Sequence, residues 1–149
     1  NRGTSGIDGC LSTATGAALE DDQLHYLLIG DMAFFYDQNA LWHHHIPENL
    51  RIILLNNHAG GIFRIIKGPS EQPELEEFFE TRQHLNADLV AQQHGIEYFP
   101  ILNLKALEET WEQFQKLSGK AKLIEITTTS QESKFIFEKF KSGIKAIWN

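Results

Sequence analysis

The sequence is poor in cysteine, has no long hydrophobic run and carries few basic side chains for its acidic ones. A single cysteine, Cys10, excludes an intrachain disulfide and is typical of proteins of a reducing cytosol. Neither a run of 18 apolar residues nor a signal-peptide pattern is present, so we expect no membrane span and a cytoplasmic location. The net charge of −7 argues against nucleic acid and anionic membrane surfaces as partners.

The chain is nevertheless rich enough in apolar residues to build a core. Its 149 residues are 42% hydrophobic and include ten phenylalanines. A chain of this length is expected to form one domain, and this apolar content is enough for a buried core.

Two short apolar runs, each ending in a polar cluster, organise the first half of the chain. Leu27–Ile29 leads into Gly30–Asp31, and Ile52–Leu55 leads into Asn56–Asn57. Runs of this kind are typical of buried parallel strands. The stretch between them, from Phe34 to about His45, lacks Gly and Pro and is long enough for one crossover helix. The pattern predicts a βαβ unit whose strands both end in polar residues, at the sheet edge where ligands bind in such folds.

These polar residues suit a small hard cation. Asp31 offers a carboxylate oxygen, Asn57 an amide oxygen and Ala59 a backbone carbonyl. Three such oxygens leave coordination positions for phosphate and water, which is how Mg²⁺ is usually held, and Mn²⁺ suits the same ligands. Gly30 would allow close approach of a phosphate, and the following helix would offer free N–H groups to it.

A purely structural interpretation of the same residues is also open. Asp31 would then be only a helix N-cap, and Asn56–Asn57 only a turn. Either cluster alone favours this interpretation, whereas the two clusters at opposite ends of one βαβ unit favour a ligand site.

The spacing of the clusters resembles a known family signature. A Gly-Asp pair followed about 26 residues later by Asn-Asn is characteristic of thiamine diphosphate enzymes. Three further stretches closely resemble the 2-succinyl-5-enolpyruvyl-6-hydroxy-3-cyclohexene-1-carboxylate synthases of menaquinone biosynthesis. They are residues 1–9 (NRGTSGIDG), 36–41 (YDQNAL) and 60–63 (GGIF). The likeness covers nearly the whole chain and is strongest from Asn1 to Ile66.

The resemblance implies a transferase that acts as a carboligase. Such an enzyme decarboxylates 2-oxoglutarate and adds the resulting succinyl semialdehyde unit to isochorismate, with thiamine diphosphate and Mg²⁺ or Mn²⁺ as cofactors. It also implies a homo-oligomer, a dimer or tetramer, and the α/β fold of this family, a three-layer sandwich whose parallel sheet has helices on both faces.

The resemblance also assigns roles to positions in this chain. The metal would be held by Asp31, Asn57 and the carbonyl of Ala59. Cofactor-binding residues would be Thr4, Ser5, Gly6 and Ile7 at the aminopyrimidine, Gly30, Asp31, Met32 and Ala33 at the diphosphate, and Asn57 and Ile62. Substrate-facing residues in the catalytic site would be Arg2, Ile62 and Phe63.

The chain departs from the family pattern in two positions and in length. Ala33 stands where serine is usual, which removes one hydroxyl donor, and Ala59 stands where glycine is usual. We expect residues 1–149 to be the C-terminal, diphosphate- and metal-binding domain, without the pyrimidine-binding and central domains. Because the activating glutamate belongs to the pyrimidine-binding domain, we expect this chain alone to be inactive.

Further along the chain, composition and periodicity predict the remaining elements. Predicted strands cover 24–29, 52–55, 96–99 and 122–127, the third ended by Pro100. Predicted helices cover 8–19 capped by Asp8, 86–94 capped by Asn86, 104–117 capped by Asn103, and 131–141 capped by Ser130, with shorter helical turns at 62–66 and 74–79. The apolar stripe of the 104–117 helix is expected to be core.

Two segments invite a functional interpretation that a plainer one matches or outweighs. Three successive histidines, His43–His45, cannot share one metal from a helix because neighbouring side chains point about 100° apart. We expect them at the solvent or an interface. The stretch 67–85 is either a mobile lid or an ordinary surface connection.

Two other functions stay open at this point. One is a different decarboxylase or an acetolactate-type member of the thiamine diphosphate enzymes, which Arg2 and the Gly60–Phe63 run disfavour. The other is a non-catalytic α/β module that binds a ligand or a partner protein.

Overall fold

The computed structural model describes residues 6–148, and the side chains of residues 6–144, as two compact units. The sheet unit consists of residues 6–56 and 86–127. The loop unit consists of residues 57–85 and 128–148. The chain therefore leaves the sheet unit twice, after Asn56 and after Thr127, and returns once, at Asn86.

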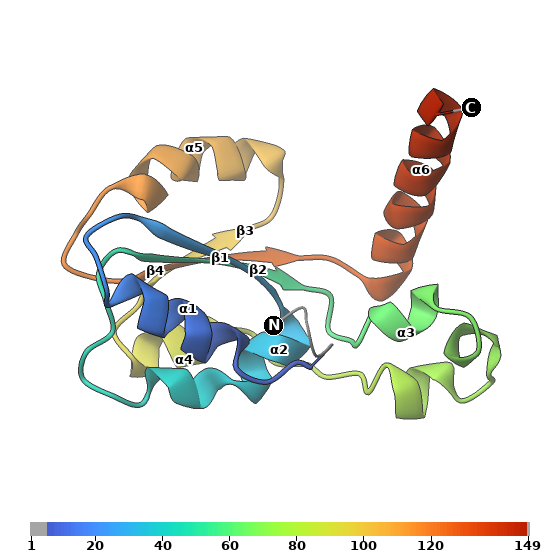
Figure 1. Ribbon diagram of the computed structural model, residues 1–149, viewed down its shortest axis with the longest axis horizontal. Coiled ribbons are helices and arrows are strands. Elements are labelled where there is room, and N and C mark those ends of the chain that lie inside the picture. The colour runs from blue at the N-terminus through green and yellow to red at the C-terminus, as the bar shows by residue number, and fades with distance from the viewer. Residues whose placement is uncertain (1–5, 149) are drawn as a thin grey trace. The chain divides into compact units, whose positions relative to one another are not determined.

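Four parallel strands form the centre of the sheet unit (Figure 1). They lie in the order β1 (His25–Gly30), β2 (Leu50–Asn56), β4 (Lys122–Thr127) and β3 (Glu97–Ile101). All four strands are those the apolar runs predict. The register places Gly30 beside Leu55 and Asn56 beside Thr127, so the strands end at one common edge.

Helices cover both faces of this sheet. Helices α1 (Cys10–Ala18), α2 (Asp31–Tyr36) and α4 (Asp88–Gln93) lie on one face, and α5 (Leu104–Gln115) lies on the other (Figure 1). This arrangement confirms the predicted α/β fold.

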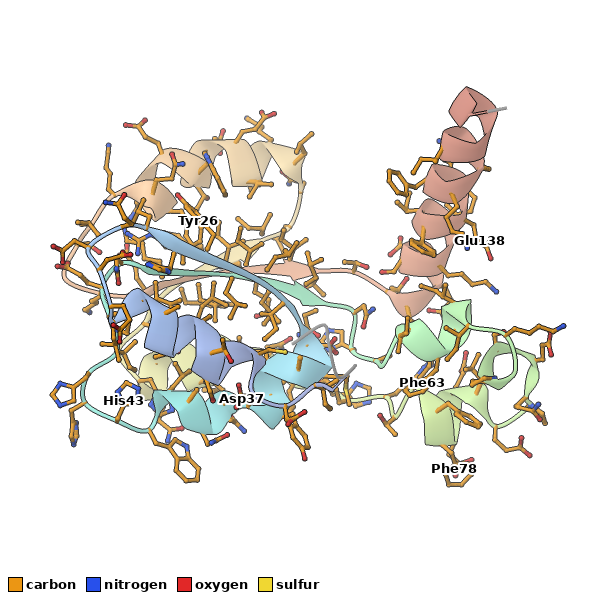
Figure 2. All side chains as sticks on the ribbon, in the orientation of Figure 1. Tyr26, Asp37, His43, Phe63, Phe78 and Glu138 are labelled. Atoms are coloured by element: carbon orange, nitrogen blue, oxygen red, sulfur yellow. The ribbon has the colours of Figure 1, made fainter. Side chains whose placement is uncertain are left out.

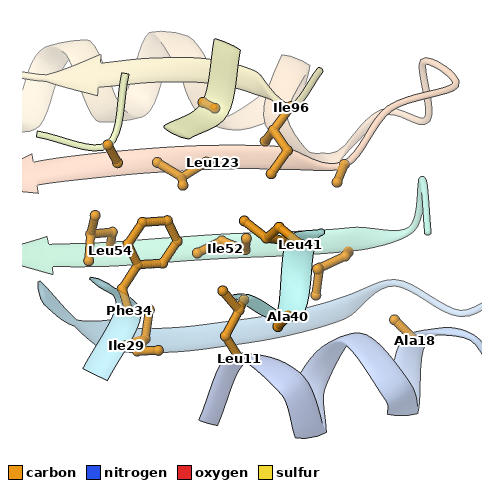
Figure 3. Packing of buried hydrophobic residues seen from close by; sticks show 14 residues of the cluster. Leu11, Ala18, Ile29, Phe34, Ala40, Leu41, Ile52, Leu54, Ile96 and Leu123 are labelled. Atoms are coloured by element: carbon orange, nitrogen blue, oxygen red, sulfur yellow. The ribbon is translucent and has the colours of Figure 1, made fainter. Parts of the chain in front are cut away.

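The main core lies between the sheet and the helices α1, α2 and α4 (Figure 3). Leu11, Phe34 and Leu41 pack there against strand residues such as Ile52 and Leu54, and all five are fully buried. On the opposite face, Phe114 of α5 packs with Ile101 and Ile124 in a smaller cluster. Tyr26 lies on this side as well, stacked 6.3 Å from Trp111 (Figure 2).

The predicted crossover helix over 34–45 is wrong in its extent. Helix α2 begins at Asp31 and ends at Tyr36, and a short 3₁₀ turn, η1 (Gln38–Leu41), follows it. The break falls at Asp37, which is buried. Its carboxylate accepts hydrogen bonds from the backbone N–H and the hydroxyl of Ser12, both at 2.7 Å, and these compensate the burial. His43–His45 follow outside any helix and are exposed, as expected.

Three predicted helix caps are wrong, and one is confirmed. Helix α1 begins after Gly9, which has φ 70° and no side-chain cap, so Asp8 does not cap it. Helix α4 begins after Ala87 rather than Asn86. The amide of Glu132 bonds to the hydroxyl of Thr129, so Thr129, not Ser130, caps α6. At α5 the carboxamide of Asn103 accepts from the amide of Ala106 at 2.9 Å, as predicted.

Two further expectations are wrong, one for strand β3 and one for helix α5. Strand β3 does not stop at Pro100 but continues to Ile101. Proline is tolerated because, among the described strands, β3 pairs only with β4 and its other edge needs no donor. Helix α5 ends at Gln115, and two members of its apolar stripe, Leu104 and Leu117, are 70% and 56% exposed.

The loop unit contains short helical turns and one long helix. Its elements are α3 (Ile62–Ile65), η2 (Pro69–Glu71), the π-helical turn η3 (Leu75–Phe79) and α6 (Ser130–Trp148). The predicted turns at 62–66 and 74–79 are thereby confirmed. Helix α6 does not end near Lys141, because Gly143 lies within it. In the described part of the chain, no helix combines the length and apolar character needed to span a membrane.

Candidate functional site: the polar strand ends

The first candidate cluster lies where β1 passes into α2. Gly30 is the last residue of β1 and the N-cap of α2, with an extended backbone that any residue adopts. A Cβ added at Gly30 would meet no atom within 4 Å. Neither backbone conformation nor packing within the described residues therefore explains glycine here, and the position leaves open space above the end of the strand.

Asp31 is the first residue of α2, and its side chain is only 3% exposed. Since the N-cap is Gly30, the interpretation of Asp31 as a mere N-cap is wrong. Met32 and Ala33 follow in the same helix and are half-buried. A buried carboxylate at the carboxyl edge of a parallel sheet is a group that a cation can use.

The second candidate cluster lies at the end of β2, and its two asparagines differ in their contacts. Asn56 belongs to the sheet unit, is fully buried, and donates its amide to Oε1 of Glu125 at 2.6 Å. Asn57, the first residue of the loop unit, is half-buried, and its Oδ1 accepts from the amide of Ala59 at 3.1 Å. His58, which lies between Asn57 and Ala59, has a φ of 57°.

This turn confirms part of the structural interpretation without excluding a ligand role. An amide oxygen has two acceptor positions, and the turn occupies one on Asn57. The carbonyl of Ala59 likewise accepts once, from the amide of Gly61 at 2.8 Å. Both oxygens are thus oriented by short local bonds and retain acceptor capacity.

The glycine pair after Ala59 is explained by close packing inside the loop unit. A Cβ added at Gly61 would lie 2.7 Å from Nδ2 of Asn57, closer than real Cβ atoms approach. At Gly60, the amide donates to the carbonyl of Glu80 at 2.7 Å, and a Cβ would lie 3.3 Å from that oxygen. Gly61 therefore makes room for the side chain of Asn57.

The remaining predicted site residues fall in three groups. Ile62 and Phe63 belong to α3. Ile62 is exposed, and the ring of Phe63, which Figure 2 labels, lies 6.0 Å from the ring of Phe79. Gly6 is half-buried and Ile7 is exposed. The other three predicted residues, Arg2, Thr4 and Ser5, lie outside the described residues.

A cluster of ion pairs that the sequence did not predict lies in the loop unit, next to the turn formed by residues 57–61. Arg64 donates from Nε to Oε1 of Glu80 at 2.8 Å and from Nη2 to its Oε2, and it also pairs with Glu76 at 2.8 Å. Arg82 contacts Glu76 at 2.9 Å. The i to i+12 and i+16 spacing of these partners is not periodic, so no helical or strand pattern reveals it.

The electrostatics of the cluster centre on Glu80, whose side chain is fully buried. Burial raises the pKa of this carboxyl, but the hydrogen bonds from Arg64 and Ser130 and the charges of Arg64 and Arg82 outweigh it, so the net pKa is lowered. The pKa of Arg64 is raised, chiefly by its hydrogen bond to Glu80. Both side chains thus stay charged at neutral pH.

Comparison with known proteins relates this whole arrangement to one group of enzymes. A 2-succinyl-5-enolpyruvyl-6-hydroxy-3-cyclohexene-1-carboxylate synthase of Cytophaga hutchinsonii is 52% identical over 145 residues, which are 97% of this chain. The synthase of that name from Flavobacterium johnsoniae is 41% identical over 94% of the chain, and one from Bacteroides fragilis is 36% identical over 97%. The chain belongs to this synthase family. No family model matches it.

The chain spans about a quarter of the length of the curated synthases it matches, 26% in the case of Cytophaga hutchinsonii. A solved structure with the same fold is benzoylformate decarboxylase from Polynucleobacter necessarius. Its TM-score is 0.69 over 80% of this chain and 23% of that one, with 16% sequence identity. This likeness confirms the fold predicted from the strand pattern.

No group of three His, Cys, Asp or Glu side chains able to hold a metal ion occurs among residues 6–148. The predicted set is of another kind, since only one of its three oxygens, that of Asp31, comes from such a side chain.

Proposed function

We propose that this chain is the C-terminal, cofactor-diphosphate and metal-binding domain of a thiamine diphosphate-dependent synthase. The enzyme would decarboxylate 2-oxoglutarate and add the succinyl semialdehyde unit to isochorismate in menaquinone biosynthesis. The 52% identity to a synthase over 97% of the chain carries the proposal, because it spans both polar clusters. The substrates, a cytoplasmic location and a homo-oligomeric assembly are parts of the same proposal.

The residues present fit a hard cation and a diphosphate. Asp31 contributes a carboxylate, whereas Asn57 and the carbonyl of Ala59 contribute neutral oxygens that a turn already orients. This is a donor set that Mg²⁺ or Mn²⁺ accepts, with positions left for phosphate oxygens. The open space at Gly30 suits close approach of a phosphate group to the backbone.

In this proposal the chain binds and orients, and the cofactor carries the chemistry. Thiamine diphosphate supplies the electron sink for decarboxylation of a 2-oxo acid when bound. Gly30, Met32 and Ala33 would line the diphosphate, and Asp31, Asn57 and Ala59 would hold the metal. Ile62 and Phe63 would face the thiazolium ring and the substrate.

Several predicted roles rest on the family resemblance alone. Thr4, Ser5, Gly6 and Ile7 would contact the aminopyrimidine, and Arg2 would pair with a substrate carboxylate. We expect no turnover from this chain by itself, because the glutamate that activates the aminopyrimidine belongs to the family's pyrimidine-binding domain, which residues 1–149 do not include.

The test is a calorimetric titration of thiamine diphosphate, with and without Mg²⁺, into the chain and two variants. We expect binding that requires the metal and weakens at least about tenfold in Asp31→Ala, a loss of about 1.4 kcal/mol. Asp22→Ala, the same change at an exposed position, is the matched control and should bind as the unmodified chain does.

Two results would count against the proposal. Equal affinity of Asp31→Ala and Asp22→Ala would remove Asp31 from the site. Metal-independent binding would favour the alternative of a non-catalytic α/β module. If no binding occurs at all, repeating the titration on a longer synthase chain separates a half-site that is too weak alone from a wrong assignment.

A further inference from the structure

A buried carboxylate on β4 holds together three segments of the sheet unit. Glu125 is 2% exposed. Its Oε1 accepts from the side-chain amide of Asn56 at 2.6 Å. Its Oε2 accepts from the backbone amide of Ala87 at 3.1 Å and from the hydroxyl of Tyr98 at 2.6 Å. All four residues lie in the sheet unit, so these contacts do not depend on the position of the loop unit.

Two of these partners, Asn56 and Ala87, flank the segment 57–85 along the chain. Asn56 is the last residue before the segment 57–85 leaves the sheet unit, and Ala87 is the second residue after it returns. The two oxygens of one carboxylate therefore bind the two ends of this segment. The same segment carries Asn57, Ala59, Ile62 and Phe63, which are four of the residues assigned to the site above.

The chemistry of the network shows why a carboxylate is suited to this place. Burying a carboxylate is costly unless hydrogen bonds compensate it, and here three donors do so. An ionised carboxylate is acceptor-only, which matches three donors. Burial, and then the hydrogen bond and charge of Glu125, raise the pKa of Tyr98, so its hydroxyl remains a donor.

We propose that Glu125 is a positioning residue, which fixes both ends of the 57–85 segment so that Asn57 and Ala59 are presented in a set geometry. It acts through Asn56 and the amide of Ala87 and does not itself touch a ligand. The proposal rests on the proposed function only for what the segment binds. The clamping of the segment ends can be tested without any cofactor.

The decisive variants reverse the polarity of the Asn56–Glu125 pair. Asn56→Asp sets a second carboxylate against Glu125 and breaks the contact. The double variant, Asn56→Asp with Glu125→Gln, restores it in the opposite direction, since the new amide N–H donates to the new carboxylate. The amide oxygen at position 125 can still accept from Ala87 and Tyr98, so every partner in the network is satisfied again.

Glu97→Gln is the matched control. Glu97 is also a strand glutamate with polar partners, accepting from Ser118 at 2.9 Å and from Gln113 at 3.1 Å and pairing with Lys122 at 3.4 Å. It is the first residue of β3 and pairs with Lys122, the first residue of β4. It thus lies where the strands begin, whereas Asn56 lies where they end. It therefore reports what loss of a sheet carboxylate does without touching the segment ends.

The first readout is amide hydrogen exchange of the chain without ligand. We expect Asn56→Asp to accelerate exchange of residues 57–61 and 83–87 at least about tenfold relative to β1, because local opening becomes easier than global unfolding. The double variant should return these amides to near the original rates, and Glu97→Gln should leave them unchanged. Equal acceleration in β1, no acceleration at all, or a double variant no better than the single would each overturn the proposal.

The second readout is the affinity for thiamine diphosphate with Mg²⁺. A loss of about tenfold in the single variant Asn56→Asp, with recovery in the double variant, would extend the positioning role to the ligand. If the unmodified chain binds no thiamine diphosphate, the affinity measurement moves to the longer synthase chain, and the exchange experiment still decides the role of Glu125. Exchange effects without any affinity effect in a chain that does bind would overturn the positioning of Asn57 and Ala59.

Discussion

The sheet unit and the loop unit are held together by different kinds of interaction. In the described residues, the sheet unit contains 17 of the 19 buried hydrophobic side chains, and the loop unit contains only Ala59 and Leu75. The loop unit instead relies on backbone bonds such as Gln83 to His58 and on the cluster of Arg64 with Glu76 and Glu80.

This difference teaches which part of the proposed site should be adaptable. Apolar burial does not change with protonation and is not screened by salt, whereas ion pairs are weakened by both protonation and screening. Gly30 and Asp31, assigned to the diphosphate and metal, stand on the apolar-cored unit. Asn57, Ala59, Ile62 and Phe63 stand on the unit held by charge.

The largest expected effect is a cavity in the core of the sheet unit. Ile52→Ala removes a fully buried side chain from β2 and should lower the free energy of unfolding by about 3–4 kcal/mol. Urea unfolding followed by circular dichroism measures it. Ile66→Ala, at an exposed isoleucine of the loop unit, should cost far less. Equal losses would mean that the two units do not differ as described.

The next effect concerns the buried charge of the loop unit. Glu80→Gln removes the charge that Arg64 binds through two hydrogen bonds, leaving Glu76 as the charged partner of Arg64. It should destabilise this unit by about 2–3 kcal/mol, since hydrogen bonds between charged groups contribute more than neutral ones. Hydrogen exchange should rise at residues 58–61 and 75–83 and stay unchanged in β1 and β2. Glu77→Gln, an exposed neighbour in the same turn, is the control. A uniform rise across both units would contradict the prediction.

The pH dependence of the loop unit follows from the lowered pKa of Glu80. The unfolded state binds a proton at the ordinary pKa of about 4.3, while the folded state resists protonation. The contribution of Glu80 to stability is therefore complete above about pH 5 and is lost as pH falls through the folded pKa. Exchange measured between about pH 6 and pH 3.5 should show the loop unit opening before β1. In Glu80→Gln, this acid-dependent step should vanish, and its persistence would assign it to another group.

The smallest effects come from two helix caps, one in each unit. Asn103→Ala removes the cap of α5, and Thr129→Ala removes the cap of α6, each at a cost of about 1 kcal/mol. The Asn103 change should appear in the global urea midpoint, whereas the Thr129 change should appear mainly as faster exchange at the start of α6. If both changes shift the global midpoint equally, the two units unfold as one.

Much of the sheet unit was predictable from the sequence because its signals are local. Apolar runs such as Ile52–Leu55 are typical of buried strands. Asn103 predicts a helix start because its side chain accepts a hydrogen bond from an amide only three residues ahead. The positions of Asp31 and Asn57 at strand ends follow from the same runs. The family resemblance then suggested what these positions bind.

Tertiary structure decided whatever depends on a partner far along the chain. Helix α2 stops at Tyr36, next to Asp37, whose carboxylate binds Ser12, 25 residues earlier. Helix α4 starts after Ala87, whose amide binds Glu125, 38 residues later. The Arg64–Glu80 pair and the contact of Glu125 with Asn56 are of the same kind. The sequence by itself determined the strands and the residues at their ends, since periodicity and capping act over a few residues. Only the fold determined how polar side chains pair, because a buried charge takes its partner from whatever segment the sheet brings beside it.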